Sequence, residues 1–60
     1  MFEIGTRVYY SGNSTITDMP VWSEGKITEI RPEGKRTTIV VDFGFYGIRY
    51  MRKSQLKKVA

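Results

Sequence analysis

Hydrophobic and polar positions alternate over short stretches of this 60-residue chain, which is the pattern of β-strands. The clearest stretch is Thr37–Phe43, where Ile39, Val41 and Phe43 fall on one face. The longest segment without Gly or Pro, Ile48–Ala60, does not sustain an apolar stripe at the helical period of 3.6 residues. The pattern therefore predicts an all-β protein.

Four more strands are predicted, at residues Thr6–Tyr10, Trp22–Ile30, Ile48–Met51 and Leu56–Val59. In the first, alternation places Tyr10 inward and Tyr9 outward. In the last, we expect Leu56 and Val59 to point at the core. The second strand is irregular, because Ile27 and Ile30 are three residues apart where a regular strand would give two. With Gly25 ahead of them, this spacing predicts a β-bulge or a sharp bend.

Turn residues separate these strands. Ser11–Ser14 has turn composition and opens a long loop over residues 11–21. Arg31–Gly34 is expected to be a turn, since Pro presets φ at its second position and Gly accepts a positive φ at its last. Gly44 and Gly47 bracket a tight hairpin, and Lys53–Gln55 is typical of a single 3₁₀ turn.

Five short strands at this spacing must curl to bury one face and remove their edges, so we expect one small, strongly bent barrel over residues 1–60. A chain of this length has room for a single domain with a small core. The 40% hydrophobic content is enough for that core. The absence of Cys and His excludes disulfides and the usual zinc sites, so we expect no metal and no cofactor.

The order of the glycine and core positions resembles that of SH3-like barrels of the Tudor and KOW type. The segments that carry the resemblance are Gly5–Val8, Glu24–Ile27 with Ile30, Val40–Phe43, Gly47–Ile48 and Leu56–Val59. The closest similarity is to the C-terminal Tudor-like domain of UvrD/PcrA-type helicases. The resemblance implies a five-stranded SH3-like small barrel. The residues themselves predict its long first loop, in which this chain departs from the helicase domain, and the single 3₁₀ turn before the last strand. Because a fold does not carry a function by itself, it says little about the partner.

Charge is distributed unevenly along the chain. Residues 1–34 hold three basic and five acidic side chains, whereas residues 35–60 hold seven basic side chains and one acidic one. A basic half of this kind is expected of a protein that meets phosphate or another acidic surface. The alternative is a solvated surface that keeps a small protein soluble.

Catalysis is not expected. With no Cys and no His, the serines lack a partner base, and no pair of the six acidic residues is selected by spacing. An enzyme pore built by oligomerisation is the remaining catalytic possibility. No apolar run approaches the roughly 18 residues that span a bilayer, so we expect a cytoplasmic protein that does not enter a membrane.

The candidate binding residues form two groups. The first is basic and comprises Lys35, Arg36, Arg49, Arg52 and Lys53. The second is an expected aromatic rim of Tyr9, Trp22, Phe45, Tyr46 and Tyr50. Exposed rings of this kind stack on bases, cover a peptide or hold a cation. The alternative for Trp22 and Tyr50 is that they cover an open end of the barrel, and the alternative for Lys57 and Lys58 is protection of an edge strand against aggregation.

Two functions follow from these groups. The first is a module that binds nucleic acid, DNA or RNA, with arginines on phosphates and rings that stack on bases or shape the groove. The second is a protein-interaction adaptor whose aromatic rim holds an acidic peptide or a polymerase-like partner. In either case we expect a monomer or a weak homo-oligomer.

Overall fold

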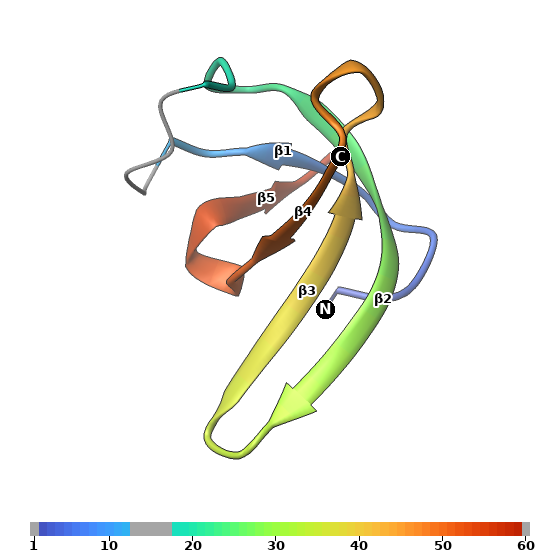
Figure 1. Cartoon of the computed structure of the whole chain (residues 1–60), viewed down its shortest axis with the longest axis vertical. Helices are drawn as coiled ribbons and strands as arrows, with labels where there is room; N and C mark the ends of the chain where they lie inside the picture. The colour runs from blue at the N-terminus through green and yellow to red at the C-terminus, as the bar shows by residue number, and fades with distance from the viewer. Residues whose placement is uncertain (1, 13–17, 60) are drawn as a thin grey trace.

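The computed structural model describes residues 2–12 and 18–59, which form five strands and two single 3₁₀ turns. The all-β prediction is confirmed. All strand pairs are antiparallel, and the strands lie side by side in the order β4-β3-β2-β1-β5 (Figure 1). In chain order the elements are β1 (Arg7–Tyr10), β2 (Glu24–Glu33), β3 (Arg36–Asp42), η1 (Gly44–Tyr46), β4 (Ile48–Met51), η2 (Lys53–Gln55) and β5 (Leu56–Lys58).

One hydrophobic cluster draws residues from all five strands. The expected core members Ile27, Ile39, Val41 and Leu56 meet in it. Its other buried members are Val8, Tyr10, Met19, Phe43 and Met51. Tyr10 is buried and Tyr9 only half-buried, as alternation along β1 predicts. Val59 departs from its prediction: it is half-buried beyond the end of β5 and is not part of the core cluster, although its N–H donates to the carbonyl of Arg7 at 3.0 Å.

β2 pairs with β1 at Glu24–Lys26 and with β3 from Lys26 onward, and its pairing becomes irregular just after this overlap. The β2–β3 register shifts between Ile27 and Glu29, so the predicted bulge is confirmed. The extra residue turns both Ile27 and Ile30 toward the core, although they are three positions apart. Gly25 lies just before the bulge, and a Cβ atom there would approach Val41 Cγ1 to 2.6 Å. The glycine therefore lets β3 pass close to β2.

The turn between β2 and β3 is shorter than the sequence suggests. The expected turn over Arg31–Gly34 is wrong, because β2 continues to Glu33 and only Gly34 and Lys35 connect it to Arg36. Gly34 has φ +63°, as the first central residue of a two-residue type II′ hairpin requires. Pro32 pairs with Thr37 in a part of β2 that has no neighbour on its other side among the described residues, and such an edge position tolerates proline.

The C-terminal half follows its prediction closely. β4 occupies Ile48–Met51, a 3₁₀ turn occupies Lys53–Gln55, and η1 fills the short hairpin between the glycines. Trp22, in contrast, lies in a turn before β2, which begins at Glu24. The long first loop lies partly outside the described residues.

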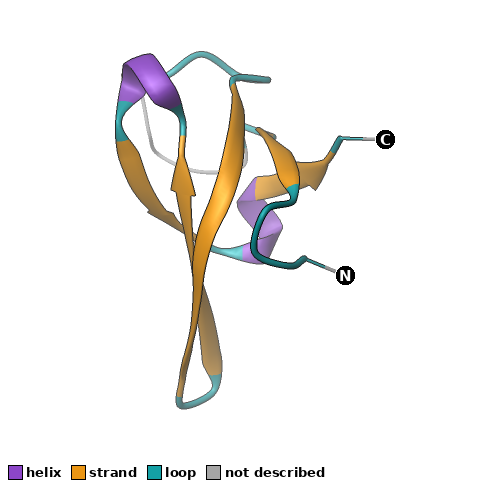
Figure 2. Ribbon diagram, turned by 90° about the vertical axis from the view of Figure 1, so that its right-hand side faces the viewer, coloured by secondary structure: helices purple, strands orange, loops and turns teal. Residues whose placement is uncertain are grey.

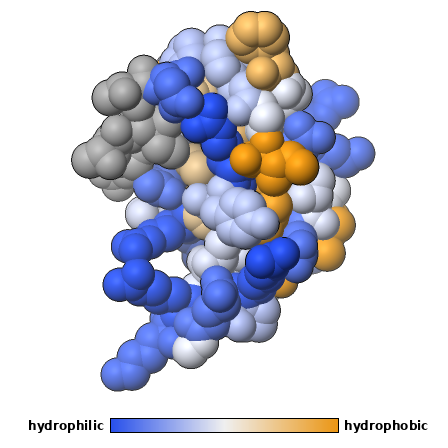
Figure 3. Space-filling view, viewed as in Figure 1, coloured by the Kyte–Doolittle hydropathy of each residue, from blue (hydrophilic) through white to orange (hydrophobic). Residues whose placement is uncertain are grey.

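The pairing leaves an open sheet with β4 and β5 as its two edges. The β2–β3 hairpin extends beyond its neighbours and projects from the rest of the molecule (Figures 1 and 2). Its projecting end is hydrophilic (Figure 3). Within residues 2–12 and 18–59, no helix is long and apolar enough to cross a membrane.

Candidate nucleic-acid interface

A surface hollow of about 300 Å³ lies where the beginning of β3 faces η2. Four of the five basic residues singled out from the sequence line it, together with two hydroxyl side chains. The lining residues are Lys35, Arg36, Thr37, Arg52, Lys53 and Ser54. We call this the basic hollow.

The hollow forms because β4 leaves the sheet before β3 ends. β4 pairs with β3 only along Ile39–Asp42, so the segment 36–38 has no strand beside it on that side within the described chain. After Met51 the chain turns away through η2. Gln55 fixes this turn, because its side-chain Oε1 accepts a hydrogen bond from the N–H of Arg52 at 2.9 Å and its own N–H donates to the Arg52 carbonyl at 3.0 Å. Two segments far apart in sequence thus place their cations around one opening.

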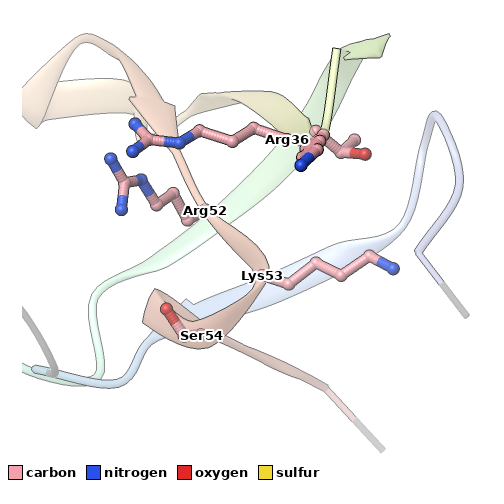
Figure 4. A pocket seen from close by; sticks show the side chains of 6 residues that line it. Arg36, Arg52, Lys53 and Ser54 are labelled. Atoms are coloured by element: carbon pink, nitrogen blue, oxygen red, sulfur yellow. The ribbon is translucent and has the colours of Figure 1, made fainter. Parts of the chain in front are cut away.

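The positive charge of the hollow is not neutralised within the described part of the chain. Its four cations form no ion pair there, and no acidic side chain lines the opening. Figure 4 shows the Arg36 and Arg52 side chains extending in the same direction, whereas Lys53 points the other way. Unpaired cations gathered in a concave surface attract anions, and two guanidinium groups offer planar donors that suit phosphate or carboxylate.

Arg49 lies apart from this group and already has a partner. Its guanidinium donates two hydrogen bonds to the carboxylate of Asp18, at 3.0 and 2.9 Å, and its Nε donates to the carbonyl of Tyr46 at 2.9 Å. Only 25% of the Arg49 side chain is exposed. The hydrogen bonds from Arg49 hold the pKa of the Asp18 carboxyl below its ordinary value. This ion pair ties the first loop to β4, so the structure places Arg49 in an internal contact and outside the hollow.

The aromatic residues expected to form one rim fall into three separate contacts. Tyr9 and Trp22 meet edge to face with ring centroids 6.0 Å apart, and Phe45 and Tyr46 do so at 5.1 Å. Tyr50 instead makes a cation–π contact with Arg31, whose Cζ atom lies 5.3 Å from the centroid of the tyrosine ring. Trp22, Phe45 and Tyr50 are exposed, whereas Tyr46 packs partly against the core.

Sequence reasoning missed Arg31, Thr37 and Ser54. The Pro-x-Gly sequence predicts a turn at Arg31, and the contact of Arg31 with Tyr50 depends on a register that alternation alone does not give. The two hydroxyl residues adjoin basic residues along the chain, and this adjacency was the available signal. No group of three acidic, Cys or His side chains that could hold a metal occurs in the described residues.

Comparison with known proteins gives no match, whether to a protein-family model, to a curated protein or to a solved structure. The function must therefore be argued from the geometry.

Proposed function

We propose that this chain is a non-catalytic module that binds nucleic acid through the basic hollow. Lys35, Arg36, Arg52 and Lys53 contact phosphates, and the module acts as a monomer or weak homo-oligomer in the cytoplasm. We also propose that its fold is an SH3-like small barrel of the Tudor and KOW type. The antiparallel order of the five strands, the bulge after Ile27, the close approach of β3 to Gly25 and the 3₁₀ turn before β5 support that assignment.

The observation that supports the proposal is one hollow lined by four cations that form no ion pair within the described residues. Lys35 and Arg36 come from the end of the β2–β3 hairpin, and Arg52 and Lys53 come from the start of η2. Lysines and arginines keep a protein soluble as well when they are spread over its surface as when they are clustered. Clustered around a concavity, however, they repel one another. Such repulsion is offset when an anion binds between them. Nucleic acid presents a regular row of anions, and the counterions that it releases provide much of the binding free energy.

The test is the salt dependence of binding to a short fluorescent oligonucleotide, followed by anisotropy. Each phosphate neutralised contributes about −0.9 to the log–log salt slope for a duplex and about −0.7 for a single strand. Four contacts therefore predict slopes of about −3.6 and −2.8. The double variant Arg36→Ala/Arg52→Ala should weaken binding and make the slope shallower by about 1.4 to 1.8.

The matched control is Lys57→Ala/Lys58→Ala. It removes the same formal charge from two exposed residues of β5, which do not line the hollow. Its slope should change less than that of the arginine double variant. Equal losses for the two double variants would mean that binding follows net charge alone, and would refute the site.

A protein-interaction adaptor is the second candidate, favoured by the exposure of two large rings. Phe45 is 94% exposed and Trp22 is 54% exposed. Aromatic side chains of this kind anchor many protein interfaces. This function predicts no oligonucleotide binding at physiological salt, and capture of an acidic or polymerase-like protein that is lost in Trp22→Ala or Phe45→Ala.

A further inference from the structure

The face of the sheet opposite the core carries an exposed ring, Tyr50, on the same side as the two arginines of the basic hollow. Across the strands, Glu29 pairs with Val40, and Val40 pairs with Tyr50. Arg52 follows Tyr50 by two positions, and Arg36 lies on β3 at even spacing from Val40. Arg52 lies beyond the end of β4, but its backbone is still extended, with φ −105° and ψ 158°. Since alternate residues of an extended chain share a face, Tyr50, Arg52 and Arg36 all belong to this outer face.

Tyr50 is held in place while most of its surface stays free. The ring is 61% exposed, and the guanidinium of Arg31 lies 5.3 Å from its centroid. Arg31 is itself fixed by Glu29, to which it donates hydrogen bonds of 2.6 and 3.2 Å. An aromatic ring positioned by a cation loses little conformational freedom when a further flat group stacks on it.

Two acidic residues of this face, Glu29 and Glu33, already accept hydrogen bonds within the protein. Glu29 is paired with Arg31, and Glu33 accepts a hydrogen bond of 2.6 Å from Thr38 Oγ1. Glu33 also lies directly opposite Arg36 across the hairpin. The cations of the hollow and the Arg31–Tyr50 pair therefore remain as the features that a ligand would recognise.

We propose that the nucleic acid bound here is single-stranded, with an unpaired base stacked on Tyr50 and the neighbouring phosphates on Arg36 and Arg52. This inference rests on the proposed function and narrows its ligand. Tyr50 and Arg52 are two residues apart on the same face, a separation of about 7 Å along an extended chain. A base inside a duplex presents only its edge, whereas an unpaired base offers the flat face that an exposed tyrosine binds.

The test compares three probes with equal numbers of phosphates: a short oligothymidylate, an abasic strand of the same length, and a duplex. Unmodified protein should bind the oligothymidylate most tightly, because the other two offer no free base. Tyr50 is the cross-strand neighbour of the buried Val40, so the informative variant is Tyr50→Leu, which keeps an apolar side chain there but removes the ring. It should weaken oligothymidylate binding by roughly 5- to 150-fold, the range for loss of one stacked base.

Two further results separate this inference from the proposed function. Tyr50→Phe keeps the ring and should retain the affinity, and Tyr50→Leu should leave duplex and abasic binding and the salt slope unchanged. Equal affinity for all three probes, with Tyr50→Leu without effect, would overturn the single-strand inference and leave the phosphate site intact. If Arg36→Ala/Arg52→Ala weakened binding no more than its control Lys57→Ala/Lys58→Ala, the phosphate site itself would be overturned.

Discussion

The close passage of β3 over Gly25 gives the sharpest test of the fold. A Cβ atom at this position would lie 2.6 Å from Val41 Cγ1, 2.7 Å from Phe43 Cδ1 and 3.0 Å from the carbonyl oxygen of Asp42. Both side chains are buried in the core, and the third contact is backbone, so none of the three can move away easily. Gly25 is also the one glycine of the described chain whose φ is not positive, so alanine meets no backbone strain there.

The magnitude for Gly25→Ala follows from two opposing effects. Overpacking a buried site costs about 1–3 kcal/mol. Replacing glycine within a strand returns about 0.5–1 kcal/mol, because the unfolded chain loses freedom. The difference between these ranges is about 0–2.5 kcal/mol. Because three neighbouring atoms would lie within 3.0 Å of the new Cβ, we expect a loss in the upper part of this range, about 1–2.5 kcal/mol. For a chain of this length it corresponds to a melting temperature lower by about 8–20 °C.

Thermal unfolding followed by circular dichroism measures this loss. A double-mutant cycle of Gly25→Ala and Val41→Ala tests whether the loss comes from this contact. Val41→Ala removes the methyl groups nearest to the new Cβ atom. The double variant should lose less stability than the sum of the two single variants, by about 0.5–3 kcal/mol. A Gly25→Ala protein that melts at or above the temperature of the unmodified protein would show that β2 and β3 are not packed this closely.

Two other contacts give independent predictions. Trp22 has φ +70°, a conformation that costs L-residues about 1–2 kcal/mol but costs glycine little. Trp22→Gly should therefore melt higher than Trp22→Ala, although both lose the contact with Tyr9, and the reverse order would contradict the backbone assignment. The hydrogen bonds from Arg49 lower the pKa of Asp18 in the folded protein, so its ionised form stabilises the fold above the unfolded pKa, and this contribution is lost as pH falls through the folded pKa. Melting temperatures of the unmodified protein and Asp18→Asn should differ most near neutral pH and converge in acid, and a pH-independent difference would refute the role of this ion pair.

Local patterns predicted the parts of the fold that depend on neighbours in sequence. Alternation predicted the inward side of Tyr10, the glycines at positions 44 and 47 predicted the hairpin that leads into the strand Ile48–Met51, and the spacing of Ile27 and Ile30 predicted the bulge. The prediction of a turn at Pro32 was wrong because two preferences of proline compete there. The Pro-x-Gly sequence favours a turn, but an unpaired strand edge also accepts proline, and only the pairing of Pro32 with Thr37 decides between them.

The site was harder to predict, because its geometry depends on contacts between distant residues. Arg36 and Arg52 line one hollow only because β4 ends where it does, and this follows from the register of Ile39 with Met51. The partner of Arg49, Asp18, is 31 residues away in the chain. Periodicity assigns each side chain to a face but does not say which side chains of that face meet.

The most direct test of the account is a titration of the isotopically labelled protein with a short oligothymidylate, followed by amide chemical shifts. We expect the largest shifts at residues 35–37 and 52–54, which line the basic hollow, with a further group around Tyr50. Shifts confined to the surroundings of Trp22 and Phe45, or no shifts at low salt, would contradict the claim that the hollow binds the phosphate backbone.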